Sequence, residues 1–352
     1  MARALSLARL GLRTTHPNPR VGCVVVAGGE VVGEGWHERA GAPHAEILAL
    51  NQAGEKARGA TVYLNLEPCC HQGRTPPCTD ALIDAGVSRV VAAMQDPNPQ
   101  VGGGGFRILR AAGIDVDVGL MADCARTLNR GFVSRMTLGR PWVTVKVAAS
   151  LDGRTAMVDG ESQWITSEAA RRDVHRLRAR VSAVMTGSGS ALADDPVLTA
   201  REAGVSRQPL RVLVDGGLRV PASARLFAEP TDVLIAATHE QAGASYGAHV
   251  ELIALPGEDG HVDLVQLLQH LGDRGMNELL VEAGPSLSGV LLKNGLVDEI
   301  VFYFAPKCLG SHAMGMFELP QVKGLDQHIG LKLIDLRQIG PDIKATVLVQ
   351  RD

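Results

Sequence analysis

The chain has 352 residues, a length typical of two domains, and 45% of them are hydrophobic, enough to build full cores. Lysine and arginine (35) nearly balance aspartate and glutamate (38), so a dedicated nucleic-acid binder is disfavoured. The sequence contains no apolar run long enough to span a membrane, and its first ten residues do not form a signal peptide, so we expect a soluble, cytoplasmic protein.

Residues 1–139 predict a first α/β domain. A helix over residues 1–10 precedes β-rich runs at 21–27 and 30–35, which the Gly28-Gly29 turn joins as a hairpin. Helices are expected over 44–53, 79–85 and 105–113, and strands over 61–66, 88–94 and 114–119. This order implies a mixed sheet covered by helices, and residues 128–139 are expected to form the connection to a second domain.

Residues 140–352 predict a second α/β domain with its own core. Strands are expected over 142–148, 183–186, 210–214, 233–237, 278–282 and 297–305, and an arginine-rich helix over 168–180. Several of these strands are continuous apolar runs, which suit a sheet covered on both faces. Glycine-rich turns at 187–190 and 282–289 each follow a strand and open a helix, where backbone N–H groups could hold a phosphate.

The most informative segment combines His44-Ala45-Glu46 with a cysteine loop that starts at Glu67-Pro68-Cys69 and ends at Cys78. His44, Cys69 and Cys78 offer one imidazole and two thiolates, which leaves the fourth position of a tetrahedral zinc ion open for water. Zinc makes that water acidic, and Glu46 can take its proton and deliver it to a departing amine. Cys70 and His71 remain rival ligands.

A His-x-Glu sequence followed by Pro-Cys-x-x-Cys is the signature of zinc nucleobase deaminases. Here the second thiolate comes nine positions after the first, so residues 70–77 must loop out and return, and Thr75-Pro76-Pro77 would stiffen the return path. The other three cysteines, Cys23, Cys124 and Cys308, are expected to be core residues.

Together with residues 16–24 and 33–37, these motifs resemble the deaminase half of the bifunctional riboflavin biosynthesis deaminase/reductase family. The long cysteine loop separates that family from cytidine and tRNA deaminases. The resemblance implies a cytidine-deaminase-like α/β/α domain, and it implies that Asn18 helps to seat the pyrimidine ring near the zinc. Two departures are visible: Cys70 stands where serine is usual, and Gly102 to Gly105 lack a basic residue that could contact phosphate.

The resemblance continues through residues 146–155, 160–166, 186–189, 192–199 and 281–287, and it implies a dihydrofolate-reductase-like α/β domain that uses NADPH. The implied NADPH site comprises Ala148, Thr155, Trp164, Ser190, Asp194, Gly216, Gly284, Pro285, Ser286, Leu287, Ser288, Gly289 and Val290. The implied substrate site comprises Ser162, Arg178, Leu198, Arg201 and Glu282, of which the two arginines suit a 5-phosphate. Without the resemblance, Arg178 would be interpreted as part of a solvated helix face, because four other arginines surround it.

Lys146, Asp194 and Glu282 are the candidates for polarising the ribose-derived carbonyl or imine and passing a proton during hydride transfer. The expected protein is thus a bifunctional enzyme with Zn²⁺ and NADPH as cofactors, small phosphorylated pyrimidines as substrates, and a homo-oligomeric state. Its expected substrate is 2,5-diamino-6-(5-phosphoribosylamino)pyrimidin-4-one and its final product 5-amino-6-(5-phosphoribitylamino)uracil.

Two other functions compete with this one. The first is a nucleoside or tRNA deaminase with an accessory domain, which the scarcity of aromatic residues for base stacking disfavours. The second is a zinc-binding regulatory protein whose catalytic sites have decayed, against which the presence of both Glu46 and Glu282 argues.

Overall fold

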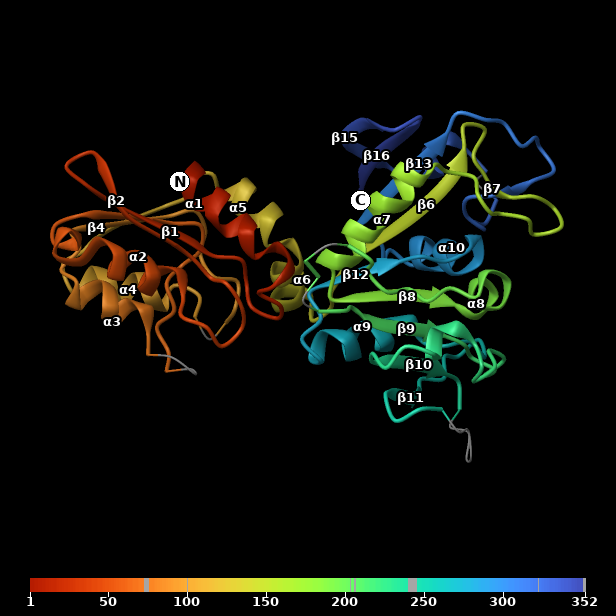
Figure 1. Cartoon of the computed structure of the whole chain (residues 1–352), viewed down its shortest axis with the longest axis horizontal. Coiled ribbons are helices and arrows are strands. Elements are labelled where there is room, and N and C mark those ends of the chain that lie inside the picture. Colours follow the sequence, from red (N-terminus) through yellow and green to blue (C-terminus); the bar gives the residue numbers. More distant parts are fainter. Residues whose placement is uncertain are drawn as a thin grey trace. The chain divides into compact units, whose positions relative to one another are not determined.

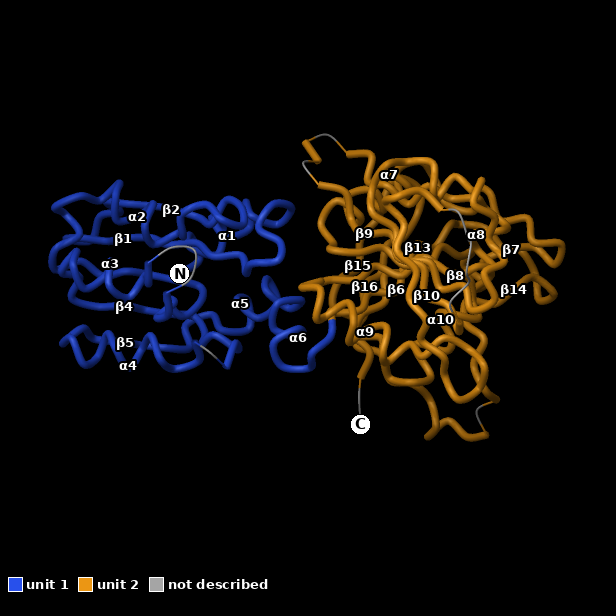
Figure 2. Tube along the Cα trace, turned by 90° about the horizontal axis from the view of Figure 1, so that it is seen from below, with its two compact units in different colours: residues 1–140 blue, residues 141–352 orange. Residues whose placement is uncertain are grey.

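The computed structural model describes residues 1–72, 76–99, 101–202, 204–205, 207–239, 246–321 and 323–350. The prediction that Thr75 stiffens the cysteine loop lies outside these residues, as do Gly73 and Arg74. The chain divides into two compact units, residues 1–140 and 141–352, which Figure 2 shows in different colours. Each unit has its own buried cluster of hydrophobic side chains.

The first unit is built on a five-stranded sheet in the order β2-β1-β3-β4-β5. Its strands are β1 (Gly22–Ala27), β2 (Glu30–Trp36), β3 (Thr61–Leu64), β4 (Arg89–Ala92) and β5 (Asp115–Val118). β1 runs antiparallel to β2 and β3, whereas β3, β4 and β5 are parallel, so the predicted mixed sheet is confirmed. The predicted hairpin is also confirmed, because Gly28 and Gly29 both adopt positive φ in the turn between β1 and β2.

Helices cover both faces of this sheet (Figure 1). They are α1 (Ala2–Ala8), α2 (Ala45–Ala53), α3 (Cys78–Asp84), α4 (Gly104–Ala111), α5 (Ala122–Leu128) and α6 (Arg130–Leu138), with short 3-10 turns η1 (Arg9–Arg13) and η2 (Gly54–Ala57). Residues of α2, α3 and α4 pack with Cys23 and Val25 of β1, whereas α1 packs with Val24. Because successive residues of a strand face opposite sides, the unit is a three-layer α/β/α structure.

The backbones of α2 and β2 lie so close together that positions 33 and 35 of the 33–37 motif must be glycine. A Cβ on Gly33 would lie 2.1 Å from the Ala49 carbonyl oxygen, and one on Gly35 would lie 2.3 Å from that of Ala45. Any side chain at either position would therefore push away the helix whose first turn carries Glu46.

The prediction that residues 128–139 form a connection is wrong, since most of them form α6. Phe132 of this helix is buried against Leu5 and Ala93, with Val133 and Met136 packed at the margin. The prediction that all three remaining cysteines are core residues is also wrong. Cys23 is buried in β1, but Cys124 and Cys308 are exposed, and all six cysteines are free thiols.

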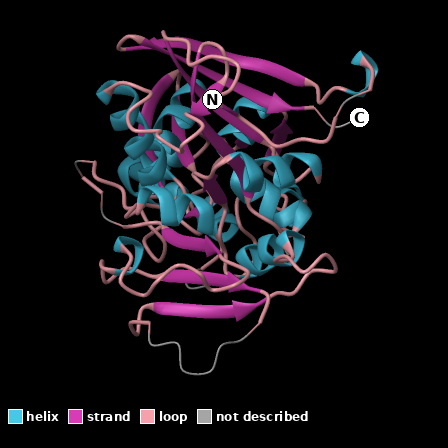
Figure 3. Cartoon of the chain, turned by 90° about the vertical axis from the view of Figure 1, so that its right-hand side faces the viewer, coloured by secondary structure: helices cyan, strands magenta, loops and turns pink. Residues whose placement is uncertain are grey.

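The second unit is built on a nine-stranded sheet in the order β11-β10-β9-β8-β12-β6-β13-β16-β15 (Figure 1). Figure 3 shows the strands in magenta and the helices in cyan. Its strands are β6 (Trp142–Ser150), β8 (Ala183–Gly187), β9 (Leu210–Val214), β10 (Val233–Ala237), β11 (Val250–Ala254), β12 (Glu278–Val281), β13 (Glu299–Ala305), β15 (Leu331–Ile339) and β16 (Asp342–Val349), with a separate pair β7 (Arg154–Ala156) and β14 (Met314–Gly315). All neighbours from β11 to β13 are parallel, and β16 and β15 complete the sheet in antiparallel pairing.

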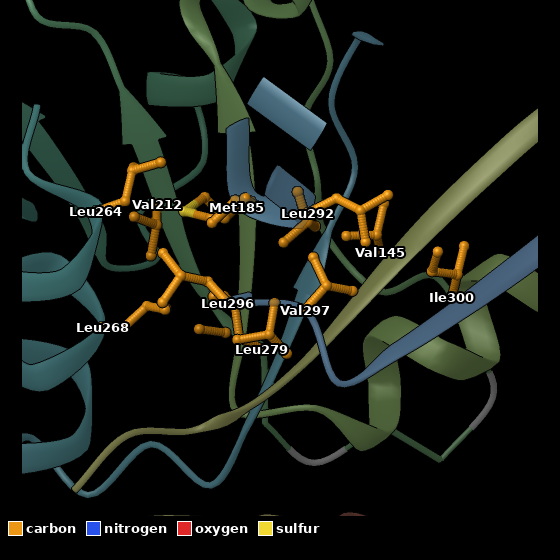
Figure 4. Close-up of a cluster of buried hydrophobic side chains, with 14 of the residues drawn as sticks. Val145, Met185, Val212, Leu264, Leu268, Leu279, Leu292, Leu296, Val297 and Ile300 are labelled. Atoms are coloured by element: carbon orange, nitrogen blue, oxygen red, sulfur yellow. The ribbon is translucent and has the colours of Figure 1, made fainter. Parts of the chain in front are cut away.

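Hydrophobic clusters on both faces confirm that the sheet is covered on both sides. One face packs against α9 (Leu264–Asp273) and α10 (Pro285–Lys293), with Leu268 and Leu292 beside Val212 and Leu279 (Figure 4). The opposite face packs against α7 (Glu168–Arg180) and α8 (Ser188–Asp194). Two 3-10 turns, η3 (Arg225–Phe227) and η4 (Leu325–Gln327), complete the elements of this unit in the described residues. Within those residues, no helix has the length and apolar character needed to cross a membrane.

Candidate functional site

Three predicted metal ligands meet at one end of the first unit. His44 is the residue that precedes α2, Cys69 follows β3 in an irregular segment, and Cys78 begins α3. The His44 Nδ1 atom lies 3.1 Å from the Cys78 Sγ and 3.5 Å from the Cys69 Sγ, and the three atoms lie within 4.8 Å of one another. The Cys78 backbone N–H also donates a hydrogen bond of 3.3 Å to the Cys69 Sγ.

This donor set fits a zinc ion. One imidazole nitrogen and two sulfurs are the ligands that zinc prefers, and three protein ligands leave a position for water. Hydrogen bonds from the Cys78 thiol and from His44 hold the pKa of Cys69 well below its usual range, which favours the thiolate form that binds metal.

The rival ligands Cys70 and His71 do not belong to the His44, Cys69 and Cys78 cluster. The Cys70 Sγ instead lies 4.0 Å from the Val101 carbonyl oxygen, and a Cβ on Gly104 would come within 2.8 Å of it. The two departures from the family pattern are therefore in contact, because glycine at position 104 leaves room for the cysteine at position 70.

Glu46 lies beside this cluster in the first turn of α2 and is only 3% exposed. Burial raises the pKa of its carboxyl group, which also forms a hydrogen bond with the Cys78 thiol. A carboxyl group with a raised pKa exchanges protons closer to neutral pH, as a general acid and base must.

Asn18 is connected to the cluster through His37, for which sequence reasoning named no role. The Asn18 Nδ2 donates a 3.0 Å hydrogen bond to His37 Nε2, and His37 Nδ1 donates to the Pro43 carbonyl oxygen at 3.2 Å. The His37 ring packs edge-on against His44 with 5.4 Å between ring centroids. Burial lowers the pKa of His37, so the neutral ring accepts from Asn18 and fixes its amide.

Glu67 is a second residue whose role the sequence did not reveal. Its buried carboxylate accepts backbone N–H hydrogen bonds from Asp96, Gly103 and Phe106, at 3.1, 2.9 and 3.2 Å. Glu67 therefore ties the segment between β4 and α4 to the residues that carry Cys69. In the same segment, burial raises the pKa of the Asp96 carboxyl to about 6. The only signal in the sequence was the position of Glu67 two residues before the predicted ligand Cys69.

The second unit contains a cleft of 1710 Å³ next to the carboxyl ends of its parallel strands. Most of the residues predicted to bind NADPH or substrate, and the catalytic candidate Lys146, line it. They are Lys146, Ala148, Thr155, Ser162, Trp164, Arg178, Ser190, Asp194, Leu198, Arg201, Gly216, Glu282, Gly284, Pro285, Ser286, Leu287 and Val290.

Arg178 and Glu282 form the central ion pair of this cleft. Arg178 Nε and Nη2 donate to Glu282 Oε1 and Oε2 at 2.5 and 3.0 Å, and Arg178 Nη1 donates to the Thr199 carbonyl oxygen at 3.1 Å. The side chains are 13% and 9% exposed, so the interpretation of Arg178 as part of a solvated helix face is wrong.

Lys146 on β6 is electrostatically coupled to this pair and to Asp194. Burial lowers the pKa of the Lys146 ammonium, while the carboxylates of Glu282 and Asp194 act in the opposite direction. Burial alone would raise the pKa of Glu282, but the Arg178 guanidinium brings it below its usual value. The Asp194 carboxylate also accepts hydrogen bonds from Ser162 and Gln163. The three predicted catalytic residues thus share one electrostatic network.

The turn before α10 fits a dinucleotide phosphate. Gly284 precedes the helix, Pro285 occupies its first turn, and that turn carries no acidic residue. Ser190 Oγ accepts a 2.8 Å hydrogen bond from the Gly284 N–H, which joins this turn to α8. The structure places Ser288 and Gly289 away from the cleft: Ser288 is buried, and a Cβ on Gly289 would lie 2.2 Å from the Glu318 carbonyl oxygen.

Comparison with known protein families divides the chain in two. Residues 1–94 match the cytidine and deoxycytidylate deaminase zinc-binding region, and residues 141–345 match the RibD C-terminal domain. The chain is 52% identical to the riboflavin biosynthesis protein RibD of Escherichia coli strain K12, over 97% of this chain and 96% of that protein. It is 48% identical to the protein of the same name from Haemophilus influenzae, over 98% and 95% of the two chains.

Solved structures give the same result. The chain superimposes on Acinetobacter baumannii RibD (form 1) with a TM-score of 0.92 and 43% identity, over 99% of this chain and 98% of that one. A diaminohydroxyphosphoribosylaminopyrimidine deaminase/5-amino-6-(5-phosphoribosylamino)uracil reductase from Thermotoga maritima gives a TM-score of 0.89 and 34% identity, over 99% and 97%. The predicted fold class, an α/β protein with a cytidine-deaminase-like first half, is confirmed.

Proposed function

Because the chain belongs to the RibD family of riboflavin biosynthesis proteins, we propose that it catalyses two consecutive reactions in two domains. Residues 1–139 deaminate 2,5-diamino-6-(5-phosphoribosylamino)pyrimidin-4-one hydrolytically, and residues 140–352 then reduce its ribosyl chain with NADPH to give 5-amino-6-(5-phosphoribitylamino)uracil. The observation that carries the proposal is the occurrence, in one chain, of a His-Cys-Cys cluster beside a buried glutamate and of a cleft with a buried Lys-Glu-Arg network.

In the deaminase domain, His44, Cys69 and Cys78 would hold the zinc ion. Bound zinc supplies the Lewis acidity that makes water a nucleophile at neutral pH. Glu46 takes a proton from the attacking water and delivers it to the 2-amino group, so that a C–O bond forms as the C–N bond breaks and ammonia leaves. The raised pKa of Glu46 supports this double role. The hydrogen bond to His37 orients the Asn18 amide for the pyrimidine ring.

In the reductase domain, NADPH supplies the hydride that adds to carbon 1 of the sugar. The ammonium of Lys146 polarises the carbonyl or imine and donates the proton that balances the hydride. Glu282 and Asp194 keep Lys146 oriented, and Arg178 keeps Glu282 ionised. Two of the Arg178 donor groups are already bonded to Glu282, so Arg201 is the better candidate for the substrate 5-phosphate. Ser162 and Leu198 complete the substrate site.

We further propose that the protein acts as a homo-oligomer in the cytoplasm. β15 is the last strand of the nine-stranded sheet, and its residues Leu333 and Leu336 are 56% and 61% exposed. An exposed apolar edge strand is costly in water, and pairing with a second copy would remove that cost. Six free thiols are consistent with a reducing compartment.

Mass spectrometry of the diaminopyrimidinone phosphate after incubation with the zinc-loaded protein tests the function. Without NADPH, the expected product has oxygen in place of one amino group, and with NADPH it has gained two further hydrogens. Deamination of cytidine or tRNA instead would identify a nucleoside or tRNA deaminase. Zinc binding without turnover of any of these substrates would identify a regulatory protein.

A further inference from the structure

The large cleft continues from the catalytic residues to the turn that follows β9. In the sheet order, β12 ends one residue before Glu282, β8 is its neighbour, and β9 lies one strand further out. Two strand spacings correspond to roughly 10 Å. Gly216 and Arg219, in the turn after β9, both line the cleft. A dinucleotide that reacts at Glu282 and crosses the α10 turn with its phosphates would thus bring its adenosine half toward Arg219.

The Arg219 guanidinium is anchored on one side and open on the other. Its Nη2 donates a 2.6 Å hydrogen bond to Ser188 Oγ, and its Nε lies 3.9 Å from Asp215 Oδ1. Ser188 and Asp215 are both buried, and Asp215 is itself fixed by the Val220 backbone N–H at 2.8 Å. The Arg219 side chain is nevertheless 66% exposed. These contacts orient the cation while leaving it accessible to a ligand in the cleft.

The charged residues around this end of the cleft indicate which kind of group Arg219 would bind. A Cβ on Gly216 would contact Val262, which adjoins the loop that carries Glu258 and Asp259. The two acidic residues also line the cleft, and their carboxylates would repel a phosphate. Arg219 is the cation that would offset this repulsion for an anion bound beside it. NADPH differs from NADH by one such anion, the phosphate on the 2′-oxygen of the adenosine ribose.

We propose that Arg219, anchored by Ser188 and Asp215, binds the 2′-phosphate of NADPH and makes the reductase select NADPH over NADH. The inference rests on the proposed reductase function and adds to it the residue that determines nucleotide specificity. Arginine suits this task because its planar donors match phosphate oxygens in pairs.

Isothermal titration of the full chain with NADPH and, separately, with NADH tests the inference without an activity measurement. The variant Arg219→Gln removes the charge of an exposed side chain, and Arg172→Gln, on the exposed face of α7, is the matched control. We expect Arg219→Gln to weaken NADPH binding by about 10- to 100-fold while NADH binding changes less than about twofold. Arg219→Lys should retain part of the preference, and Arg172→Gln all of it.

Equal loss of NADPH and NADH binding in Arg219→Gln would overturn the inference, because Arg219 would then contact a group that both nucleotides share. The variant Arg225→Gln removes another arginine that lines the cleft and lies between β9 and β10 in the chain. If Arg225→Gln lost NADPH binding selectively and Arg219→Gln did not, the inference would also be overturned. A wild-type chain that binds neither nucleotide would contradict the proposed reductase function itself.

Discussion

Arg178 and Glu282 face each other as a two-point ion pair, with Nε–Oε1 and Nη2–Oε2 distances of 2.5 and 3.0 Å, although they are 104 positions apart in the chain. α7 brings the guanidinium and the end of β12 brings the carboxylate, so the pair exists only when helix and sheet are packed together. Both groups are buried, and removal of either one leaves the other without its ion-pair partner.

The variant Arg178→Met should therefore lose both stability and reductase activity. Because Glu282 would remain buried without its partner, we expect a loss of about 3–5 kcal/mol in the free energy of unfolding, measured by urea denaturation. The double variant Arg178→Met/Glu282→Gln should be more stable than the sum of the two single effects predicts. Additive losses would show that the pair is not energetically coupled, and Arg172→Met controls for loss of a helix arginine.

Because reduction needs protonated Lys146, the rate of reduction should decrease at alkaline pH. Burial lowers the pKa of its ammonium, so the side chain loses its proton at a lower pH than an ordinary lysine, whose pKa is about 10.4. A step that needs the protonated form slows as pH rises through this lowered value. At saturating NADPH, the rate of reduction should therefore decrease at alkaline pH, and the midpoint of this decrease should lie below about pH 10.4. In Lys146→Arg, which stays charged, the falling limb should disappear even though the rate is lower; an unchanged limb would assign it to another group.

Glu46→Gln should separate zinc binding from deamination. The amide keeps the size of the side chain but cannot take a proton from water, so we expect deamination to fall by about 100- to 10,000-fold. Zinc content, measured by elemental analysis, should equal that of the wild type, because the proposed ligands are His44, Cys69 and Cys78. Reduction of the deaminated substrate by the same preparation serves as the control. Near wild-type deamination would rule out Glu46 as the proton carrier.

The variant Glu67→Gln should lower the stability of the first unit and impair deamination, without affecting reduction. Two carboxylate oxygens accept three backbone N–H groups, whereas an amide offers one oxygen, so at least one of these buried N–H groups loses its partner. The expected cost is about 1–3 kcal/mol in the stability of the first unit. Deamination should have a raised KM, because the segment from Asp96 to Phe106 loosens beside the cluster, while reduction is unchanged. The exposed Glu55→Gln is the matched control, and an equal effect in it would refute the role of Glu67.

The sequence predicted elements that depend on contacts between nearby residues, and it missed elements that depend on contacts between distant residues. Helix 168–180 was predicted with the observed bounds of α7, because its periodicity is local and the Ser167 hydroxyl caps it by accepting from the Ala170 N–H. α6 was missed because Phe132, Val133 and Met136 form a short apolar face that is explained only by distant Leu5 and Ala93. β15 was missed because its side chains are mostly exposed and show no alternation between a buried and an open face.

By itself, the sequence determined the chemistry that each half can perform. His44, Glu46, Cys69 and Cys78 are close enough in the chain for their spacing to indicate a zinc site, since ligand types and short separations are local properties. Only the tertiary structure decided that Arg178 pairs with Glu282, that Glu67 holds the segment beside the cluster, and that Arg219 is presented to the cleft by Ser188 and Asp215. These contacts form because the order of strands in the sheet makes particular strand ends neighbours. No local sequence pattern encodes that order.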